Sequence, residues 1–372
     1  MSKLTKYKFN NLYEMSSGIS SSKEQAGHGS PFISFSTVFN NYFLPEELPD
    51  LMDTSLKEQE IFSVRKDDVF ITRTSETVDA LAMSCVAVKD YPKATFSGFV
   101  KRLRPKTTGI VYSKYIAFFL RSKYFRKVLD CNTIMTLRAS FNEDMFSFLY
   151  LYLPDYEEQV RIGDLLYKME MKIRTNNKIN DNLTAMAYDI YMHSFFSKKP
   201  NAKLKDILVE ADKSSVQVGE AKQSTGEYPF FTSGSAILKW DTPFINGRNC
   251  FLNTGGNADV KFYVGEAAYS TDTWCISANN NMSDYLYLLL VSIKPELNQK
   301  FFQGTGLKHL QKPLLKDRPI YIPDFEELKT FNEQVTPMFN IISENTRENQ
   351  ELITLRDWLL PMLMNGQATI GD

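Results

Sequence analysis

The residues most suggestive of catalysis are two carboxylates and a lysine between Pro154 and Lys172. Pro154-Asp155 followed by Glu170-Met171-Lys172 matches the letters of the PD…ExK pattern of Mg²⁺-dependent nucleases. The carboxylates of that pattern must converge on one metal ion from adjacent strands. Here Asp155 caps a predicted helix and Glu170 lies further along it, which places the two carboxylates roughly 20 Å apart. The match therefore predicts no metal site.

Other catalytic patterns are missing from the sequence. It contains no GxGxxG or GxxxxGK[ST] loop that would bind a dinucleotide or ATP. It also lacks the Asp/Asn-Pro-Pro-aromatic tetrapeptide expected of an amino-methyltransferase. The three histidines (His28, His193 and His309) are isolated, so no Ser-His-acid arrangement can be proposed. The sequence predicts no catalytic residue, no metal and no cofactor.

Basic residues are concentrated in one part of the chain. From Lys89 to Lys127 there are eleven basic residues against one acid, although the formal charge of the whole chain is −1. Phosphates respond to the local field, so an overall count hides such a region. A solvated helix face explains part of this segment, but it explains the run from Lys101 to Lys106 less well. The run favours a nucleic-acid partner.

Composition limits the class of protein. A length of 372 residues predicts two to three domains, and 43% apolar residues suffice for sizeable cores. The sequence has no run of about 18 apolar residues and no basic-then-apolar leader, which predicts a soluble, cytoplasmic protein. Four well-separated cysteines are expected to be buried free thiols: Cys85, Cys131, Cys250 and Cys275.

The chain contains an internal repeat. Residues 152–159 (YLPDYEEQ) return as residues 321–328 (YIPDFEEL), an offset of 169. Each copy ends an apolar run and opens a helix with an N-cap aspartate, Asp155 or Asp324. A glutamate three positions later can reach back to the N–H of the cap. The repeat therefore predicts two equivalent helix starts.

The offset of 169 continues through both helices. Apolar residues spaced by three and four over about five turns predict a coiled-coil seam. Between Ile173 and Leu183 both copies carry a seam asparagine, Asn176 and Asn345, which would fix the register. We therefore expect an intramolecular antiparallel coiled coil. The matched apolar pairs are Ile162/Phe331, Leu166/Val335, Met169/Met338, Ile173/Ile342, Leu183/Leu352, Met186/Leu355 and Ile190/Leu359.

The segments before the helices, 1–153 and 199–322, resemble each other only weakly. Both contain an apolar strand after a proline, then a buried strand that leads to a polar turn, and finally one apolar helix (112–129 or 284–291). This order predicts an α+β fold with a pseudo-two-fold internal repeat. We expect two variable domains, 1–153 and 199–322, separated by helices within 154–198 and 323–372.

With this order of elements, the chain resembles the specificity (S) subunit of type I restriction-modification enzymes over its whole length. Leu153–Gln159 and the helix after it resemble the central conserved region of that family, and Leu355–Gln367 resembles its C-terminal conserved region. Four stretches of the second domain look like a target-recognition-domain pattern. They are Tyr228–Gly234, Gly255–Ala258, Ser270–Trp274 and Gly306–Leu310.

The resemblance implies a non-catalytic DNA-recognition subunit. Each domain would read one half of a split double-stranded DNA target, and the paired helices would set the spacer between the halves. The helices would also dock two modification subunits, which methylate adenine, and two restriction (motor) subunits would complete the complex. The alternatives from other classes are a coiled-coil scaffold that does not read DNA and, less favoured, a Mg²⁺-dependent nuclease.

The candidate DNA contacts are polar and basic loop residues, since Arg and Lys bind phosphates or guanine edges and Asn pairs with adenine. In the first domain they are Arg73, Arg102, Arg104, Lys106 and Arg138. In the second they are Thr232, Ser233, Asn257, Lys261, Thr271, Thr273 and Lys308. Taken singly, each is more readily an ordinary surface residue.

Two departures from the repeat stand out. The first domain has Thr72-Arg73-Thr74-Ser75-Glu76 where the second has a Gly-Gly turn, so its reading loop must be built differently. The second helix carries Pro337 where the first has Lys168. Proline removes a helical hydrogen bond, so a kink or restart is expected there.

Overall fold

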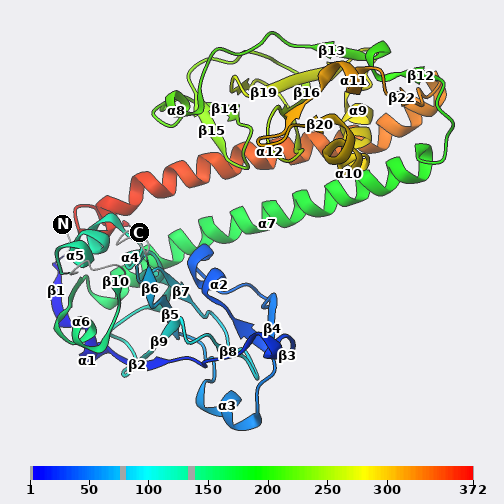
Figure 1. Cartoon of the computed structure of the whole chain (residues 1–372). Coiled ribbons are helices and arrows are strands. Elements are labelled where there is room, and N and C mark those ends of the chain that lie inside the picture. Colours follow the sequence, from blue (N-terminus) through cyan, green and yellow to red (C-terminus); the bar gives the residue numbers. More distant parts are fainter. Residues whose placement is uncertain (1–2, 76–80, 133–138, 372) are drawn as a thin grey trace. The chain divides into compact units, whose positions relative to one another are not determined.

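The computed structural model describes residues 3–75, 81–132 and 139–371. The chain divides into two compact units, and each long helix runs from one unit into the other (Figure 1). Unit 1 consists of Met1–Met171 with Leu352–Asp372, and unit 2 is Lys172–Glu351.

Unit 1 is built on a four-stranded antiparallel sheet in the order β2-β9-β5-β7 and a three-stranded sheet in the order β4-β3-β8. In the smaller sheet β3 pairs antiparallel with β4 and parallel with β8. The strands are β2 (Tyr13–Ser17), β3 (Ala26–Ile33), β4 (Asp50–Met52), β5 (Val69–Thr72), β7 (Ser84–Val86), β8 (Thr95–Phe96) and β9 (Val100–Pro105). Two short pairs join β1 (Thr5–Lys8) to β11 (Tyr150–Leu153) and β6 (Thr74–Ser75) to β10 (Ala139–Ser140).

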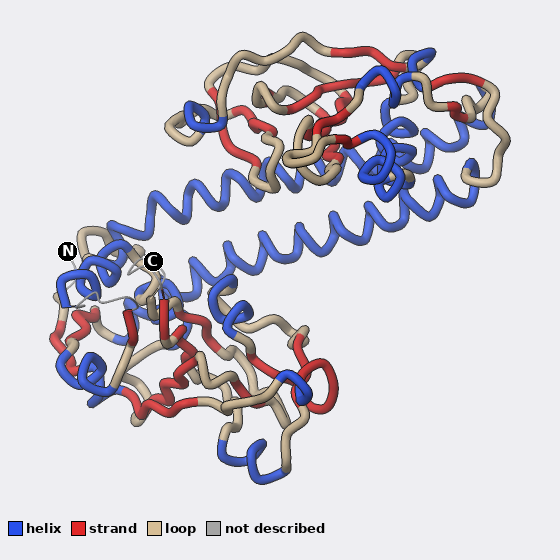
Figure 2. The backbone as a smooth tube through the Cα atoms, in the orientation of Figure 1, coloured by secondary structure: helices blue, strands red, loops and turns tan. Residues whose placement is uncertain are grey.

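Figure 2 draws the helices of this unit in blue and its strands in red. The helices are α1 (Phe9–Leu12), α2 (Phe35–Asn40), α3 (Leu56–Ile61), α4 (Ser113–Phe119), α5 (Lys123–Asn132) and α6 (Glu143–Phe148). The single apolar helix expected over 112–129 is in fact two, α4 and α5. The break falls at Ser122, whose Oγ accepts the backbone N–H of Phe125 at 3.3 Å and so starts a new helix.

Unit 2 repeats this architecture. Its sheets have the orders β13-β19-β16-β17 and β15-β14-β18, and β14 again pairs antiparallel with one neighbour and parallel with the other. The strands are β12 (Ala202–Lys203), β13 (Leu208–Glu210), β14 (Tyr228–Phe231), β15 (Ile237–Trp240), β16 (Arg248–Asn253), β17 (Val260–Val264), β18 (Ala268–Tyr269), β19 (Thr273–Ala278), β20 (Phe302–Gln303), β21 (His309–Leu310) and β22 (Pro319–Ile320). The helices are α8 (Val218–Ala221), α9 (Ser283–Ser292), α10 (Lys294–Glu296) and α11 (Lys312–Lys316). The weak sequence likeness between the domains therefore conceals one shared topology.

The two long helices are α7 (Tyr156–Phe195) and α12 (Phe325–Met364), each of 40 residues. They begin where the repeat predicts. Asp324 forms the full capping box with Glu327, whereas Asp155 accepts only the backbone N–H of Glu158 at 2.8 Å. The Glu158 side chain instead accepts hydrogen bonds from Arg161 and from the backbone of Ile370.

Within each unit, side chains join α7 to α12 with opposed chain directions. In unit 2 Asn176 donates to Asn349 at 2.9 Å, and Asn345 donates to Asn180 at 2.8 Å. These two bonds are related by the offset of 169, so Asn180 and Asn349 belong to the same polar layer as the two predicted asparagines. In unit 1 Arg356 binds Glu170 at 3.2 Å.

The apolar seam follows the prediction only in part. Ile162, Leu166, Phe331 and Val335 are fully or almost fully buried, but Met186 is 52% exposed and Leu355 is 43% exposed. Beyond the asparagines the buried positions of α7 are instead Ala187, Tyr191 and Phe195. A straight helix drifts by about 20° per heptad, so a strict continuation of the first pattern misses the buried face.

Helix α12 continues through Pro337 rather than ending and restarting there. The helix is held on both sides of the proline by Arg248, which donates to the Thr336 carbonyl at 3.3 Å and to Asn340 at 2.7 Å. Arg248 is itself fixed by the buried carboxylate of Asp284 at 2.7 Å. The surrounding contacts therefore offset the hydrogen bond that proline cannot make.

Cys250 and Cys275 are free and buried, as the sequence predicts, Cys85 is also buried, and the side chain of Cys131 lies outside the described residues. Burial raises the pKa of Cys275 to about 12. In the described part of the chain, no helix combines the length and apolar content needed to cross a membrane.

Candidate nucleic-acid interface

In unit 2, turns from four parts of the chain meet at one end of the large sheet. The Thr254 N–H donates to the Asp272 carbonyl at 3.0 Å, and Ser270 N–H donates to the Phe231 carbonyl at 2.9 Å. The Gly256 N–H binds the Lys308 carbonyl at 2.9 Å. These bonds join segments 232–236, 254–259, 270–272 and 304–309 into one surface, here named loop cluster 2.

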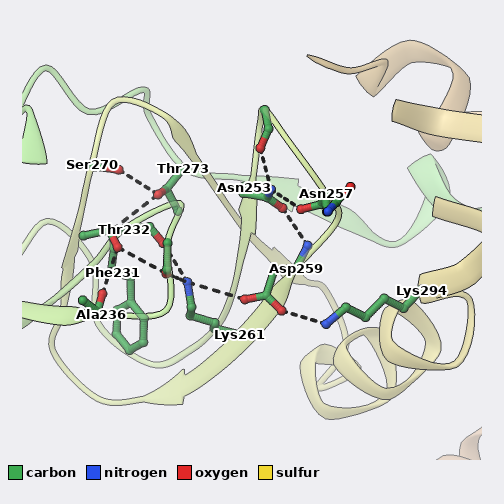
Figure 3. Close-up of polar contacts among 12 residues, drawn as sticks. Phe231, Thr232, Ala236, Asn253, Asn257, Asp259, Lys261, Ser270, Thr273 and Lys294 are labelled. Atoms are coloured by element: carbon green, nitrogen blue, oxygen red, sulfur yellow. Dashed lines mark hydrogen bonds and ion pairs between the residues drawn. The ribbon is translucent and has the colours of Figure 1, made fainter. Parts of the chain in front are cut away.

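Three of the predicted contacts hold this cluster together. Lys261 Nζ donates to the Thr232 carbonyl at 2.7 Å and also to the Gly234 carbonyl (Figure 3). Burial lowers the pKa of Lys261, while neighbouring Asp259 acts in the opposite direction. Thr232 and Thr273 are 4% and 5% exposed, and their hydroxyls bond to Ala236 and Ser270. Thr232, Lys261 and Thr273 therefore position the turns, and a direct DNA contact by any of them stays a prediction.

Asn253, the last residue of β16, is a functional residue that was not among the predicted contacts. Its amide nitrogen donates to the Gly255 carbonyl at 2.7 Å and to the Asn257 carbonyl, and its amide oxygen accepts Asp259 N–H at 2.7 Å. Figure 3 shows Asn253 between these partners. Asn followed closely by Gly-Gly is a turn signal that could have identified it.

The other predicted residues of unit 2 present their side chains outward. Asn257 and Lys308 are exposed, and Ser233 and Thr271 are partly exposed. The Thr271 N–H donates to the Val216 carbonyl at 2.9 Å, which fixes its turn without occupying its hydroxyl. These four residues therefore contribute one cation, one amide and two hydroxyls to the outer face of loop cluster 2.

Unit 1 contains the same backbone frame with other side chains. The Arg73 N–H donates to the Phe99 carbonyl at 2.9 Å, as Thr254 does to Asp272. Ser97 N–H donates to the Ile33 carbonyl at 3.0 Å, and Gly98 N–H to the Ile19 carbonyl at 2.7 Å, which match the bonds of Ser270 and Thr271. The segments 73–75, 97–99 and 139–141 form loop cluster 1.

The predicted basic contacts of unit 1 divide into two groups. Arg73 is exposed in loop cluster 1, and Lys106 is exposed while its Nζ donates to the Asn10 carbonyl at 2.9 Å. Arg102 is only 9% exposed and donates to the Ser63 carbonyl at 2.6 Å. Burial lowers its pKa. Arg138 lies outside the described residues.

Arg104 also points inward. Its guanidinium makes a two-pronged contact with Asp68 at 2.7 and 2.6 Å, and this carboxylate is 1% exposed. The bond to Asp68 raises the pKa of Arg104. Strand β9 therefore directs both cations onto buried acceptors, and a DNA contact by Arg102 or Arg104 stays a prediction.

Much of the remaining basic run is used in the same way. Arg121 donates to the backbone carbonyls of Ser84, Val38, Phe39 and Asn41, at 2.6–3.0 Å. Lys114 binds Asp164 at 2.8 Å. Part of the charge of residues 89–127 is thus structural, while five of its lysines are exposed: Lys89, Lys93, Lys106, Lys123 and Lys127.

The residues that match the nuclease pattern do not form a metal site. Asp155 caps α7, Glu170 is paired with Arg356, and Lys172 binds Glu348 at 3.1 Å. In residues 3–75, 81–132 and 139–371, no group of three or more His, Cys, Asp or Glu side chains is placed to hold a metal ion.

Two copies of one sheet topology, each followed by a 40-residue helix, make this an internally duplicated α+β protein. Residues 2–185 and 198–354 match the model of the type I restriction modification DNA specificity domain. These two matches cover most of the chain, which therefore belongs to that family. The resemblance in the sequence is confirmed.

Individual relatives agree with the family. The chain is 21% identical over 334 residues to the MjaIX specificity subunit of Methanocaldococcus jannaschii, covering 77% of this chain and 76% of the relative. Its fold is similar to the S subunit from M. genitalium, with a TM-score of 0.65, 13% identity, and coverage of 97% of this chain and 96% of that one. The specificity subunit from Thermoanaerobacter tengcongensis aligns over 98% of this chain and 97% of that one at 12% identity, but with a TM-score of only 0.38.

Proposed function

We propose that the chain is a non-catalytic reader in which each domain recognises one half of a bipartite DNA target. The domains are residues 1–153 and 199–322. The observation that carries the proposal is the pair of loop clusters, which share one hydrogen-bonded backbone frame and present different exposed side chains. A fixed frame with variable side chains suits two readers of different sequence preference.

The long helices act as the ruler between the half-sites. At 1.5 Å per residue, each 40-residue helix is roughly 60 Å long. They pair as an intramolecular antiparallel coiled coil, and the layer of Asn176, Asn180, Asn345 and Asn349 fixes its register. Buried amides that bond only in one alignment penalise slipped pairings.

The helix starts dock the partner subunits. Two grooves at equivalent positions support this assignment. One, in unit 1, is lined by Tyr156 with Tyr112 and Lys114, and the other, in unit 2, is lined by Phe325 with Met282 and Asn332. Tyr156 and Phe325 are related by the offset of 169. The repeat thus offers two like surfaces for two modification (methyltransferase) subunits, and two restriction subunits complete a cytoplasmic complex without a cofactor bound by this chain.

The test is to lengthen the ruler. Asn180 faces Asn345, so one heptad inserted after Asn180 and another inserted before Asn345 lie at the same level and leave the polar layer intact. The added length is about 10 Å, or on the order of three base pairs at 3.4 Å each. We expect the complex with its modification subunits to methylate the same two half-sites with a longer spacer, as read by sequencing methylated adenines.

A single heptad after Asn180 is the matched control. It moves the second half of α7 out of register with α12 and should abolish the active complex. If the doubly extended protein assembles and still methylates sites of the original spacing, the helices are not the ruler. A purified complex that binds all DNA sequences equally would instead favour the scaffold.

A further inference from the structure

One position in each loop cluster differs in chemical character between the units. Phe99 in unit 1 and Asp272 in unit 2 are equivalent, because each accepts, through its carbonyl, the N–H of the residue that follows a central strand, Arg73 or Thr254. Phe99 is 65% exposed, and Asp272 is also exposed. The same point of the backbone frame therefore carries an apolar ring in one unit and a carboxylate in the other.

The turn that carries Phe99 is rigid. Gly98 N–H binds the Ile19 carbonyl at 2.7 Å, Phe99 N–H binds Ser97 Oγ at 3.2 Å, and Val100 N–H binds the Ser97 carbonyl at 2.9 Å. A Cβ at Gly98 would lie 3.0 Å from the Ile19 oxygen, so the two segments pass close together. These backbone hydrogen bonds hold the exposed Phe99 ring in place beside exposed Arg73. The ring does not need to pack against the protein to keep this position.

The exposed carboxylate of Asp272 limits what this position can bind on DNA. A negative charge on a surface that meets phosphates is repelled by them, so it weakens general DNA affinity. It becomes favourable only against a hydrogen-bond donor on a base edge, and in the major groove carboxylates accept from the cytosine amino group. A phenylalanine at the same point instead contacts the methyl group of thymine.

We propose that Phe99 and Asp272 are specificity-determining residues, each reading one base pair of its own half-site. This inference rests on the proposed function and deepens it. Phe99 contacts a thymine methyl in the half read by unit 1. Asp272 accepts a hydrogen bond from a cytosine amino group in the half read by unit 2.

The experiment uses the full chain with its modification subunits. Methylated adenines first define the wild-type target, and methylation rates are then measured on duplexes in which each target base pair is replaced in turn. Phe99→Ala should reduce discrimination at one pair of the first half by about 5- to 150-fold, which is the range for one base contact. Asp272→Asn should do the same at one pair of the second half.

A chemical probe isolates the methyl contact. Replacing that thymine with deoxyuracil should slow the wild-type protein and leave Phe99→Ala unaffected, while Phe99→Leu should retain part of the preference. Phe148→Ala removes another exposed phenylalanine, outside the loop cluster. Asp241→Asn removes a carboxylate at the opposite end of the β14–β15 hairpin from Thr232. Neither control should change any base preference.

The outcomes separate this inference from the function beneath it. A wild-type complex that methylates one bipartite target, with unchanged discrimination in Phe99→Ala and Asp272→Asn, overturns the reading roles of these two residues. A wild-type complex whose methylation does not depend on this chain overturns the proposed function itself. Loss of discrimination at a pair in the other half-site would contradict the assignment of each domain to one half.

Discussion

Units 1 and 2 hold the same backbone frame with different residues. At the end of the central strand, buried Thr72 in unit 1 accepts the Met83 N–H at 3.0 Å, and Asn253 takes the same place in unit 2 by accepting the Asp259 N–H at 2.7 Å. Each is a buried polar side chain that satisfies a backbone donor of the next segment. Both units therefore need a side chain that can accept a hydrogen bond at this position, but the residue type can differ.

The two units also differ in what their Arg and Lys side chains bind. Unit 1 turns Arg102, Arg104 and Arg121 toward backbone carbonyls and Asp68. Unit 2 uses two lysines, Lys261 and Lys294, to hold turns of its loop cluster, and leaves Lys308 exposed. A count of basic residues therefore overstates the positive surface of unit 1.

The largest effect is expected from exchanging one whole domain. Replacing residues 199–322 with the corresponding segment of a relative should give a new second half-site and leave the first half-site unchanged. The reason is that each unit has its own core and its own loop cluster. Sequencing of methylated adenines in cells measures both halves at once, and a simultaneous change in both would break the one-domain-per-half assignment.

Two smaller effects should distinguish a cation that is bound inside the protein, Arg104, from one that is exposed, Lys308. Arg104→Ala removes the cation that pairs with the buried Asp68 carboxylate and should cost about 3 kcal/mol of stability, with no change in the salt dependence of DNA binding. Lys308→Ala should leave the stability unchanged and lower the log–log salt slope by up to about 0.9. Thermal unfolding and binding titrations of the complex at several salt concentrations measure the two quantities. A lower slope for Arg104→Ala would place that residue on the DNA.

The smallest difference concerns the two buried residues that close the central strands. Asn253→Ala leaves two carbonyls and one N–H without their partner and should cost about 2 kcal/mol. Thr72→Val keeps the shape and removes the hydroxyl that accepts Met83 N–H, so about 1 kcal/mol is expected. Chemical denaturation of the purified chain provides the comparison. Equal losses would show that the hydrogen bonds from Asn253 to the Gly255 and Asn257 carbonyls add nothing to the stability.

The sequence predicted the parts of the fold that depend on local signals. The repeat, the N-caps at Asp155 and Asp324, the starts of both long helices and the mixed α+β class all follow from short-range patterns. The shared sheet order did not follow, because strand pairing depends on contacts between distant segments. Thr72 and Asn253 show why: their common role is visible only once their hydrogen bonds are known.

The candidate site was harder to predict, because residue type does not reveal direction. Arg73 and Arg102 look alike in the sequence, yet one lies in a loop and the other on a strand with its guanidinium inside. Side chains alternate between the two faces of a strand, so a shift of one residue decides between solvent and core. The same difficulty misplaced Met186 and Leu355 on the long helices, where a small rotation moves a residue out of the buried face.

Unit 1 is discontinuous in the chain, and this has a consequence for synthesis. Leu363 and Met364 belong to its buried core, and Ile370 N–H binds Glu158, so residues 352–371 complete a unit that residues 1–171 begin. On the ribosome, residues 172–351 must be made in between, which takes on the order of tens of seconds at about 5–20 residues per second. Unit 2, which is continuous, can finish folding first. During that interval the apolar surface that the end of α12 covers in unit 1 stays exposed, which makes the nascent chain prone to aggregation.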